Sequence, residues 1–337
     1  MPDATPTPTA SPSRARRNKR WLAAQIVITA IVLWFVGRAL VVQWREFHDV
    51  PLTAQPNWIY IVVSGGLFWL TYAVLIETLR RVLVTWDGGD TGRLSFMTVA
   101  RLWSISNFGR YVPGKVWGIG AMATMANKAG IGGVAAAGSA VLNTIVNIAA
   151  GLLVALIAGW RSFDVISHGR TGVGIVLVIT AFAGVLALPL LLPKMLEIVR
   201  RFTGRTISVS NVPHRSVYWA LAGNLFSWVL YGAAFRMFVF GVLGSAPGSF
   251  ADYVTAYAWP YILGYLAVFV PGGLGVRELA LAAALTTLGV ASPRQAALVS
   301  VASRLWLTVL ELLPGVLFLV AGTRSRSNAT HLDGSTR

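Results

Sequence analysis

The chain of 337 residues contains no cysteine, so disulfides, thiolate nucleophiles and cysteine metal sites are excluded. Its four histidines match no metal-binding spacing and fall in expected loops or in the C-terminal tail: His48, His168, His214 and His331. The sequence also has no nucleotide-binding loop, no nucleophile–base arrangement and no pair of carboxylates suited to catalysis. We therefore expect no enzyme activity, no metal and no cofactor.

Charge is scarce as well. Asp, Glu, Lys and Arg make up 12% of the residues, about half the fraction typical of soluble domains, whereas 55% are hydrophobic and the mean hydropathy is +0.66. Several apolar runs reach about 20 residues, which is enough to cross a bilayer. The sequence therefore predicts an all-α polytopic integral membrane protein.

Acidic residues are the scarcer sign, with 12 against 28 basic residues and a net charge of +16. The basic residues gather in short segments at the ends of apolar runs and form no single groove. This distribution fits the positive-inside rule and attraction to anionic lipids. It argues against nucleic acid as a partner.

Six full spans are expected, at residues 21–42, 58–79, 133–160, 171–192, 217–243 and 295–321. The polar, basic residues 1–20 are expected to form a disordered cytoplasmic tail, and residues 322–337 a second cytoplasmic tail. Two further apolar segments, 95–130 and 251–290, are broken by Pro and Gly, the second at Pro260 and again at Pro271. Charge counting makes each of them return to the side it came from, as a re-entrant hairpin or as two short helices.

Three short motifs recur at nearly one spacing. Val-Pro113-Gly114 returns as Val-Pro271-Gly272 after 158 residues; Trp69-x-x-Tyr72 returns as Trp228-x-x-Tyr231, and Gly130-Ile131 as Gly289-Val290, both after 159. Because the span at 58–79 runs inward and that at 217–243 runs outward, the halves 21–160 and 171–321 are predicted to form an inverted-topology repeat. Breaks at matching places in such repeats point to a transport site.

Charged residues inside apolar segments are candidate site residues, because a charge in a bilayer usually faces a cavity or a partner. The helix after each Pro-Gly break should begin with free N–H groups, which favour an anion when basic side chains lie nearby. The candidate substrate-binding residues are Arg101, Arg110, Pro113, Gly114, Lys115, Pro271, Gly272, Gly273, Arg277, Glu278 and Arg304.

Five more residues are candidate intramembrane partners: Glu77, Asn143, Asn147, Arg236 and Glu311. Glu77 matches Arg236 at the repeat spacing, so the two form either a central ion pair or separate local contacts. Arg304 and Glu311 share a helix face but lie roughly 10 Å apart, so each needs another partner or a group between them. Asn143 and Asn147 continue a polar stripe from Ser139, which either joins helices or lines a cavity.

Two stretches are similar to known family signatures. The first is Ser106-Asn-Phe-Gly-Arg-Tyr-Val-Pro-Gly-Lys115, followed by Gly130-Ile131; the second is Pro271-Gly-Gly-Leu-Gly-Val-Arg-Glu278, followed by Gly289, Arg304 and Pro314-Gly315. They resemble the lysylphosphatidylglycerol synthase transmembrane-region family, also described as flippase-like, over about residues 21–321. Asn143-Thr144 stands where members often carry an acidic–basic pair.

The resemblance implies the lipid-handling part of such proteins, without the soluble aminoacyl-transferase domain of the lysyl-lipid synthases. We expect a multi-pass protein of the plasma or inner membrane that translocates an anionic lipid, either a phospholipid or a polyprenyl-phosphate-linked precursor. Alternating access would use the hairpin basic residues for the phosphate, with Glu278 and Glu311 as counter-charge or proton site. Two alternatives stay open: a non-transporting partner of a lipid-linked glycosyltransferase or other cell-envelope enzyme, and a small-solute transporter.

Overall fold

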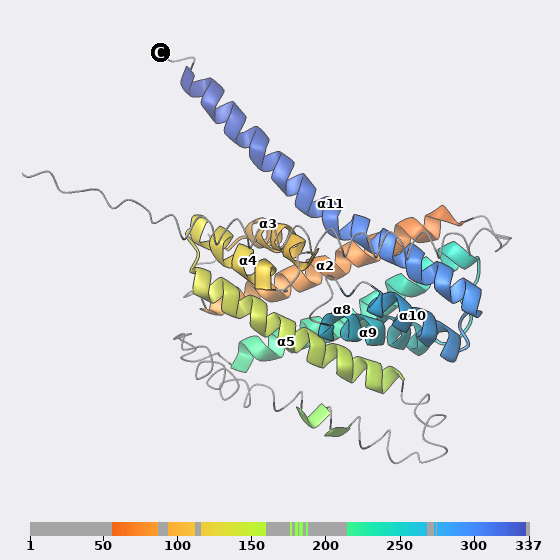
Figure 1. Ribbon diagram of the computed structural model, residues 1–337. Helices are drawn as coiled ribbons and strands as arrows, with labels where there is room; N and C mark the ends of the chain where they lie inside the picture. Colours follow the sequence, from red (N-terminus) through yellow and green to blue (C-terminus); the bar gives the residue numbers. More distant parts are fainter. Residues whose placement is uncertain are drawn as a thin grey trace, which may run out of the picture.

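The computed structural model describes residues 56–86, 94–111, 116–159, 214–267 and 275–334, together with Gly273 and scattered helical positions between 176 and 187. Within these residues every regular element is a helix (Figure 1). In chain order they are α2 (Trp58–Trp86), α3 (Phe96–Ser106), the 3-10 helix η1 (Asn107–Tyr111), α4 (Val116–Lys128), α5 (Gly133–Ala158), α8 (His214–Leu243), α9 (Phe250–Leu266), α10 (Val276–Thr287) and α11 (Pro293–Gly334).

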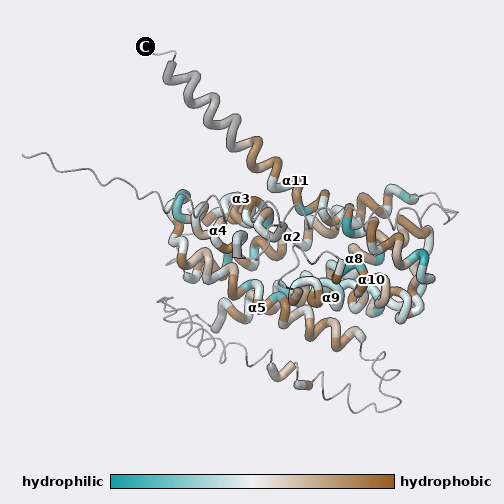
Figure 2. Tube along the Cα trace, in the orientation of Figure 1, coloured by the Kyte–Doolittle hydropathy of each residue, from teal (hydrophilic) through white to brown (hydrophobic). Residues whose placement is uncertain are grey.

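Four of these helices are long and apolar enough to cross a membrane: α2, α5, α8 and the part of α11 up to Ala321. They confirm the helices expected at 58–79, 133–160, 217–243 and 295–321. Large apolar side chains such as Trp58, Ile59 and Leu279 are exposed, and hydrophobic positions run along the whole bundle in Figure 2. Such a surface suits contact with lipid. The expected span at 21–42 and most of that at 171–192 lie outside the described residues.

Two helix ends differ from the expectation. α2 continues past Arg80 and Arg81 to Trp86, because long basic side chains are good helix formers and need not end a helix. α11 continues past Ala321 to Gly334, so a helix occupies most of the segment expected as a C-terminal tail. Figure 1 shows this end of α11 projecting beyond the bundle.

The two broken apolar segments each contain a pair of short helices in mutual contact, α3 with α4 and α9 with α10. The helices are separated by η1 and residues 112–115 in the first pair and by residues 267–275 in the second. The break expected at Pro260 is wrong, because this residue lies inside α9 and the helix runs on to Leu266. Neighbouring helices can compensate for the hydrogen bond that such a proline removes.

The matched Gly130 and Gly289 end α4 and α10 in the same way. Both have positive φ, 74° and 66°, which favours glycine. The N–H of Ile131 donates to the carbonyl of Ala126 at 2.9 Å, and the N–H of Val290 donates to that of Leu285 at 3.0 Å. These are the hydrogen bonds of a Schellman motif. The recurrence in the sequence therefore marks two similar helix ends.

The long helices cross between the two halves of the chain. α2 and α8 pack on each other, α5 packs on α8 and α9, and α11 packs on α3 and, more lightly, on α2. The main cluster of buried apolar residues accordingly draws on α2, α5, α8, α9, α10 and α11. In Figure 1, α5 lies beside α8 and α9. The last described helix of each half thus lies against the other half.

The matched Trp-x-x-Tyr motifs lie at these crossings. The indole N–H of Trp228 on α8 donates to the carbonyl of Asn147 on α5 at 2.9 Å. That of Trp69 on α2 donates to the carbonyl of Leu310 on α11 at 3.3 Å. Pro314 has no N–H to give this carbonyl its helical hydrogen bond, so the indole supplies a donor from the other half.

Candidate functional site

A cavity of about 190 Å³ lies where the two halves meet. Helices α2, α3, α4 and α5 with η1 line it from the first half, and α9, α10 and α11 from the second. Its charged lining residues in the described part of the chain are Arg277, Arg304 and Glu311; its polar ones include Ser106, Asn107, Asn143, Thr144, Tyr261 and Tyr265. A small, partly polar space with two cations and one acid can bind an anionic group.

Arg277 is the most deeply buried of these cations, with 8% of its surface exposed. Its guanidinium carbon lies 5.3 Å from the ring centroid of Tyr257 and 5.1 Å from that of Tyr261, both on α9. No carboxylate of the described residues lies within ion-pair distance of this side chain. A guanidinium carries several N–H donors, so one that lies against two aromatic rings can still donate to an anion.

Two glycines let the chain place Arg277 here. Gly273 has a φ of +67°, and a Cβ on it would lie 2.7 Å from the Cα of Gly264 on α9. A Cβ on Gly264 would in turn lie 3.1 Å from the Cβ of Arg277. The backbone after the break therefore passes directly over α9, where larger residues would force it away.

Glu278 holds the start of α10. Its Oε2 accepts the N–H of Gly275 at 2.5 Å, which caps the helix, and its Oε1 lies 3.4 Å from Nε of Arg304 on α11. The two charged side chains are only about 15% exposed. Arg304 thus has an acidic partner other than Glu311, in line with the distance argued from their spacing.

The polar stripe on α5 both joins helices and lines the cavity, the two alternatives that the sequence left open. Asn147 joins helices, since its Nδ2 donates to Oδ1 of Asn224 on α8 at 2.7 Å. Asn143 accepts from Nδ2 of Asn224 at 3.1 Å and also lines the cavity. Ser139 is buried, and its hydroxyl has no hydrogen-bond partner among the described residues.

Asn224 was missed by sequence reasoning. It is completely buried, although it belongs to the apolar run of α8. A single amide within a membrane-length apolar helix is itself a signal, because burying it is costly without a partner. Its partners on α5 could not be named without knowing which helices cross.

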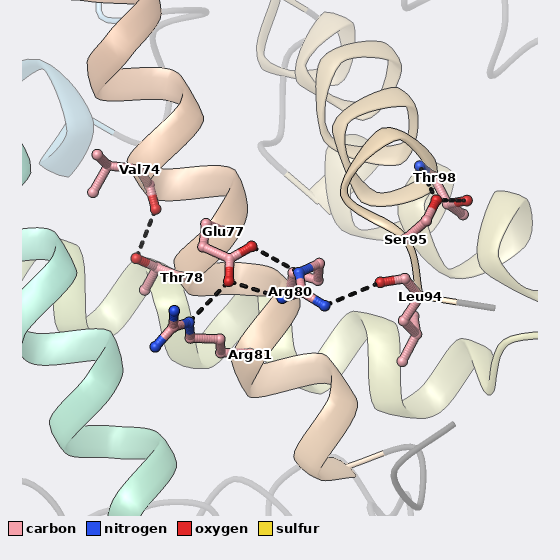
Figure 3. Close-up of polar contacts among 8 residues, drawn as sticks. All are labelled: Val74, Glu77, Thr78, Arg80, Arg81, Leu94, Ser95 and Thr98. Atoms are coloured by element: carbon pink, nitrogen blue, oxygen red, sulfur yellow. Dashed lines mark hydrogen bonds and ion pairs between the residues drawn. The ribbon is translucent and has the colours of Figure 1, made fainter. Parts of the chain in front are cut away.

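Glu77 makes local contacts. Its carboxylate accepts from Nε of Arg80 at 2.7 Å and from Nε of Arg81 at 2.9 Å, and Arg80 also donates to the carbonyl of Leu94 at 3.5 Å (Figure 3). Of the two alternatives for Glu77, the structure therefore shows the local contacts, since the first of these cations lies one helical turn away on the same helix. Arg236 lies 5.6 Å from the ring centroid of Tyr253 instead.

The first hairpin contributes fewer charges than expected. Arg101 is exposed and does not line the cavity, while Ser106 and Asn107 at the end of α3 do. Six expected residues lie outside the part whose side chains are described: Arg110, Pro113, Gly114, Lys115, Pro271 and Gly272. Of the two breaks where anion sites were expected, only the second has described site residues, namely Gly273, Arg277 and Glu278.

No group of three or more acidic or histidine side chains in the described residues is placed to hold a metal ion. No protein-family model matches this chain, and a comparison with curated proteins finds no significant match.

Proposed function

We propose that the protein is a flippase-like transporter that moves an anionic lipid across the cell membrane by alternating access. The observation that carries the proposal is the cavity between the two halves, which holds Arg277, Arg304 and Glu311. A cavity at the meeting of two repeats is where transporters of this architecture bind substrate. The resemblance of the Pro-Gly segments to flippase-like proteins supports the same assignment.

A repeated order of helices supports the two-halved mechanism. Each half has a long helix, two short helices and a second long helix, α2 to α5 and α8 to α11, and corresponding helices begin 154 to 160 residues apart. The similar ends at Gly130 and Gly289 add to this correspondence. With the charge bias at the span ends, which puts both termini in the cytoplasm, the halves are of opposite orientation. Rocking one against the other would expose the cavity to each side in turn.

The chemistry of the cavity favours a phosphate headgroup. A guanidinium presents two parallel N–H donors, which match two phosphate oxygens, and Arg277 is held ready by Tyr257 and Tyr261. The volume of about 190 Å³ suits a headgroup, while acyl or prenyl chains would stay in the bilayer. Glu278 and Glu311 would balance the cations when the cavity is empty of substrate.

Purified protein reconstituted into liposomes tests the proposal. Fluorescent phosphatidylglycerol should become accessible to a membrane-impermeant quencher faster than in protein-free liposomes. Replacing Arg277→Ala and Arg304→Ala together should abolish the gain. The matched control is Arg101→Ala, whose exposed side chain lies outside the cavity.

A second variant separates lost charge from lost folding. Arg277→Lys with Arg304→Lys keeps both positive charges but removes the two-pronged geometry, so it should retain part of the flip rate. An unchanged rate in the double alanine variant would remove these residues from the site. A wild-type protein that moves no lipid, and that instead takes up a phosphate-bearing solute, would replace the lipid proposal with small-solute transport, which the small cavity volume also fits.

A further inference from the structure

Three asparagines form a hydrogen-bonded chain at the crossing of α5 and α8. Nδ2 of Asn224 donates to the carbonyl of Ala220 at 2.7 Å and to Oδ1 of Asn143 at 3.1 Å. Oδ1 of Asn224 accepts from Nδ2 of Asn147 at 2.7 Å. Since Asn224 is completely buried, its amide donates and accepts only within the protein.

This group has a direction that the backbone fixes. The carbonyl of Ala220 can only accept, so Asn224 must turn its NH₂ group toward it. The second hydrogen of that NH₂ group is then donated to Asn143, which must accept it with Oδ1. The NH₂ group of Asn143 is thereby turned away from α8.

The consequence for the cavity is a hydrogen-bond donor. Asn143 lines the cavity together with Arg277 and Arg304, and its one side-chain hydrogen bond among the described residues uses its oxygen. Its two N–H groups therefore remain for a ligand that can only accept. Phosphate and carboxylate oxygens are such acceptors, whereas an amine or a hydroxyl proton gains nothing there.

We propose that Asn224 is a positioning residue that sets Asn143 as a donor to an anionic oxygen in the cavity. The inference deepens the proposed function and rests on its anion site, but it assigns roles that neither charge nor the repeat pointed to. Asn143 would touch the anion beside Arg277, and Asn224 would act through Asn143. Asn147 would serve only to join the helices.

The test uses inorganic phosphate as the probe and the full chain in detergent. Thermal unfolding midpoints are measured over a range of phosphate concentrations at constant ionic strength, and their rise gives an apparent Kd. Asn143→Leu and Asn224→Leu should each raise this Kd about tenfold, the size expected when a hydrogen bond to a charged group is lost. Asn147→Leu is the matched control: it loses a similar part-buried hydrogen bond on the same helix but should leave the Kd unchanged.

Coupling separates positioning from general damage. Asn224→Leu added to Asn143→Leu should raise the Kd no further, because Asn224 acts through Asn143. Asn143→Asp guards against a folding defect, since it keeps an oxygen for Asn224 and replaces only the cavity-facing NH₂ group. It should abolish phosphate protection.

Two results would overturn the inference: a wild-type protein that phosphate does not protect, or an Asn224→Leu variant with the wild-type Kd. Failure of the proposed function gives a different pattern. There, liposomes show no lipid movement, yet the phosphate Kd still depends on Asn143 and Asn224 and not on Asn147. The cavity would then be an anion site of a protein that does not move lipids.

Discussion

Trp69 and Trp228 are the same residue type at matching places in the two halves, and their surroundings differ. Trp228 is 1% exposed and lies against Gly151, whereas Trp69 is 44% exposed. Both indoles donate to a carbonyl on the last helix of the other half, at 2.9 Å and 3.3 Å. The same motif is therefore buried at one crossing and lies at the exposed edge of the other.

The positions beside these tryptophans differ in the same sense. Asn147 and Asn224 are hydrogen-bonded at the α5–α8 crossing; 159 residues away in each direction stand Trp306 and Gly65, which are in contact at the α11–α2 crossing. Two amides are hydrogen-bonded across the first crossing, whereas at the second an indole packs over a glycine beside the longer Trp69 hydrogen bond. The α11–α2 crossing is therefore expected to be the looser of the two.

The largest expected effect comes from removing each tryptophan. Trp228→Ala should lower the free energy of unfolding by about 4 kcal/mol, because it empties a fully buried indole site. Trp69→Ala should cost only about 1 kcal/mol, since much of this ring is already exposed. Thermal unfolding of the two variants in one detergent checks the difference, and equal losses would mean that the crossings are alike.

Charged residues at the two hairpins should differ in how much they contribute to stability. Arg304→Ala should cost about 3 kcal/mol, because it leaves the half-buried Glu278 carboxylate without this cation. Arg101→Ala in the first hairpin should change stability by less than about 0.5 kcal/mol. Adding Glu278→Gln to Arg304→Ala should recover part of the loss in the same unfolding measurement. If no stability is recovered, the Glu278–Arg304 ion pair does not stabilise the contact between α10 and α11.

Two glycines test how tightly each crossing is packed. A Cβ on Gly151 would lie 2.6 Å from two atoms of the Trp228 indole, so Gly151→Ala should cost about 2 kcal/mol. A Cβ on Gly65 would meet Trp306 at 2.9 Å at its outer ring edge, and Gly65→Ala should cost about 1 kcal/mol. Gly66→Ala is the control: nothing lies within 4 Å of its Cβ, and the helix should gain about 0.5 kcal/mol. Unfolding midpoints that rank Gly65→Ala below Gly151→Ala would contradict the assignment of the looser side.

The smallest effect concerns two charged side chains at matching positions of α2 and α8, Glu77 and Arg236. Glu77→Gln should cost about 0.5 kcal/mol, because its ion pairs with Arg80 and Arg81 are partly exposed. Raising the salt concentration should shrink this difference further. The corresponding Arg236 faces the ring of Tyr253, and Arg236→Gln should cost about the same. A large loss for Glu77→Gln at high salt would point to a role beyond the local ion pair.

The sequence led correctly to helices of membrane length, because long apolar runs and their spacing depend on local composition. It also led to Gly130 and Gly289, whose positive φ makes the residue type itself informative. Pro260 misled, because proline signals a break only where nothing nearby replaces the lost hydrogen bond. A structural feature can be predicted from the sequence when it does not depend on contacts with residues far away in the chain.

Most features of the candidate site depend on contacts between helices and could not be predicted from the sequence. Arg277 and Glu278 were named from their sequence, but their different surroundings, aromatic rings for one and Arg304 for the other, depend on how α9 and α11 pack. Glu77 matched Arg236 in spacing and still found nearer cations on its own helix. Asn224 carries no pattern at all, because its role arises from a crossing between helices far apart in the chain.

The exchange of long helices between the halves bears on what either half could do alone. α5 packs on α8 and α9, while α11 packs on α3 and α2, so each half completes the packing of the other. Either half produced separately would expose the surface of its last long helix that the other half now covers. The stability of the chain therefore belongs to the two halves together.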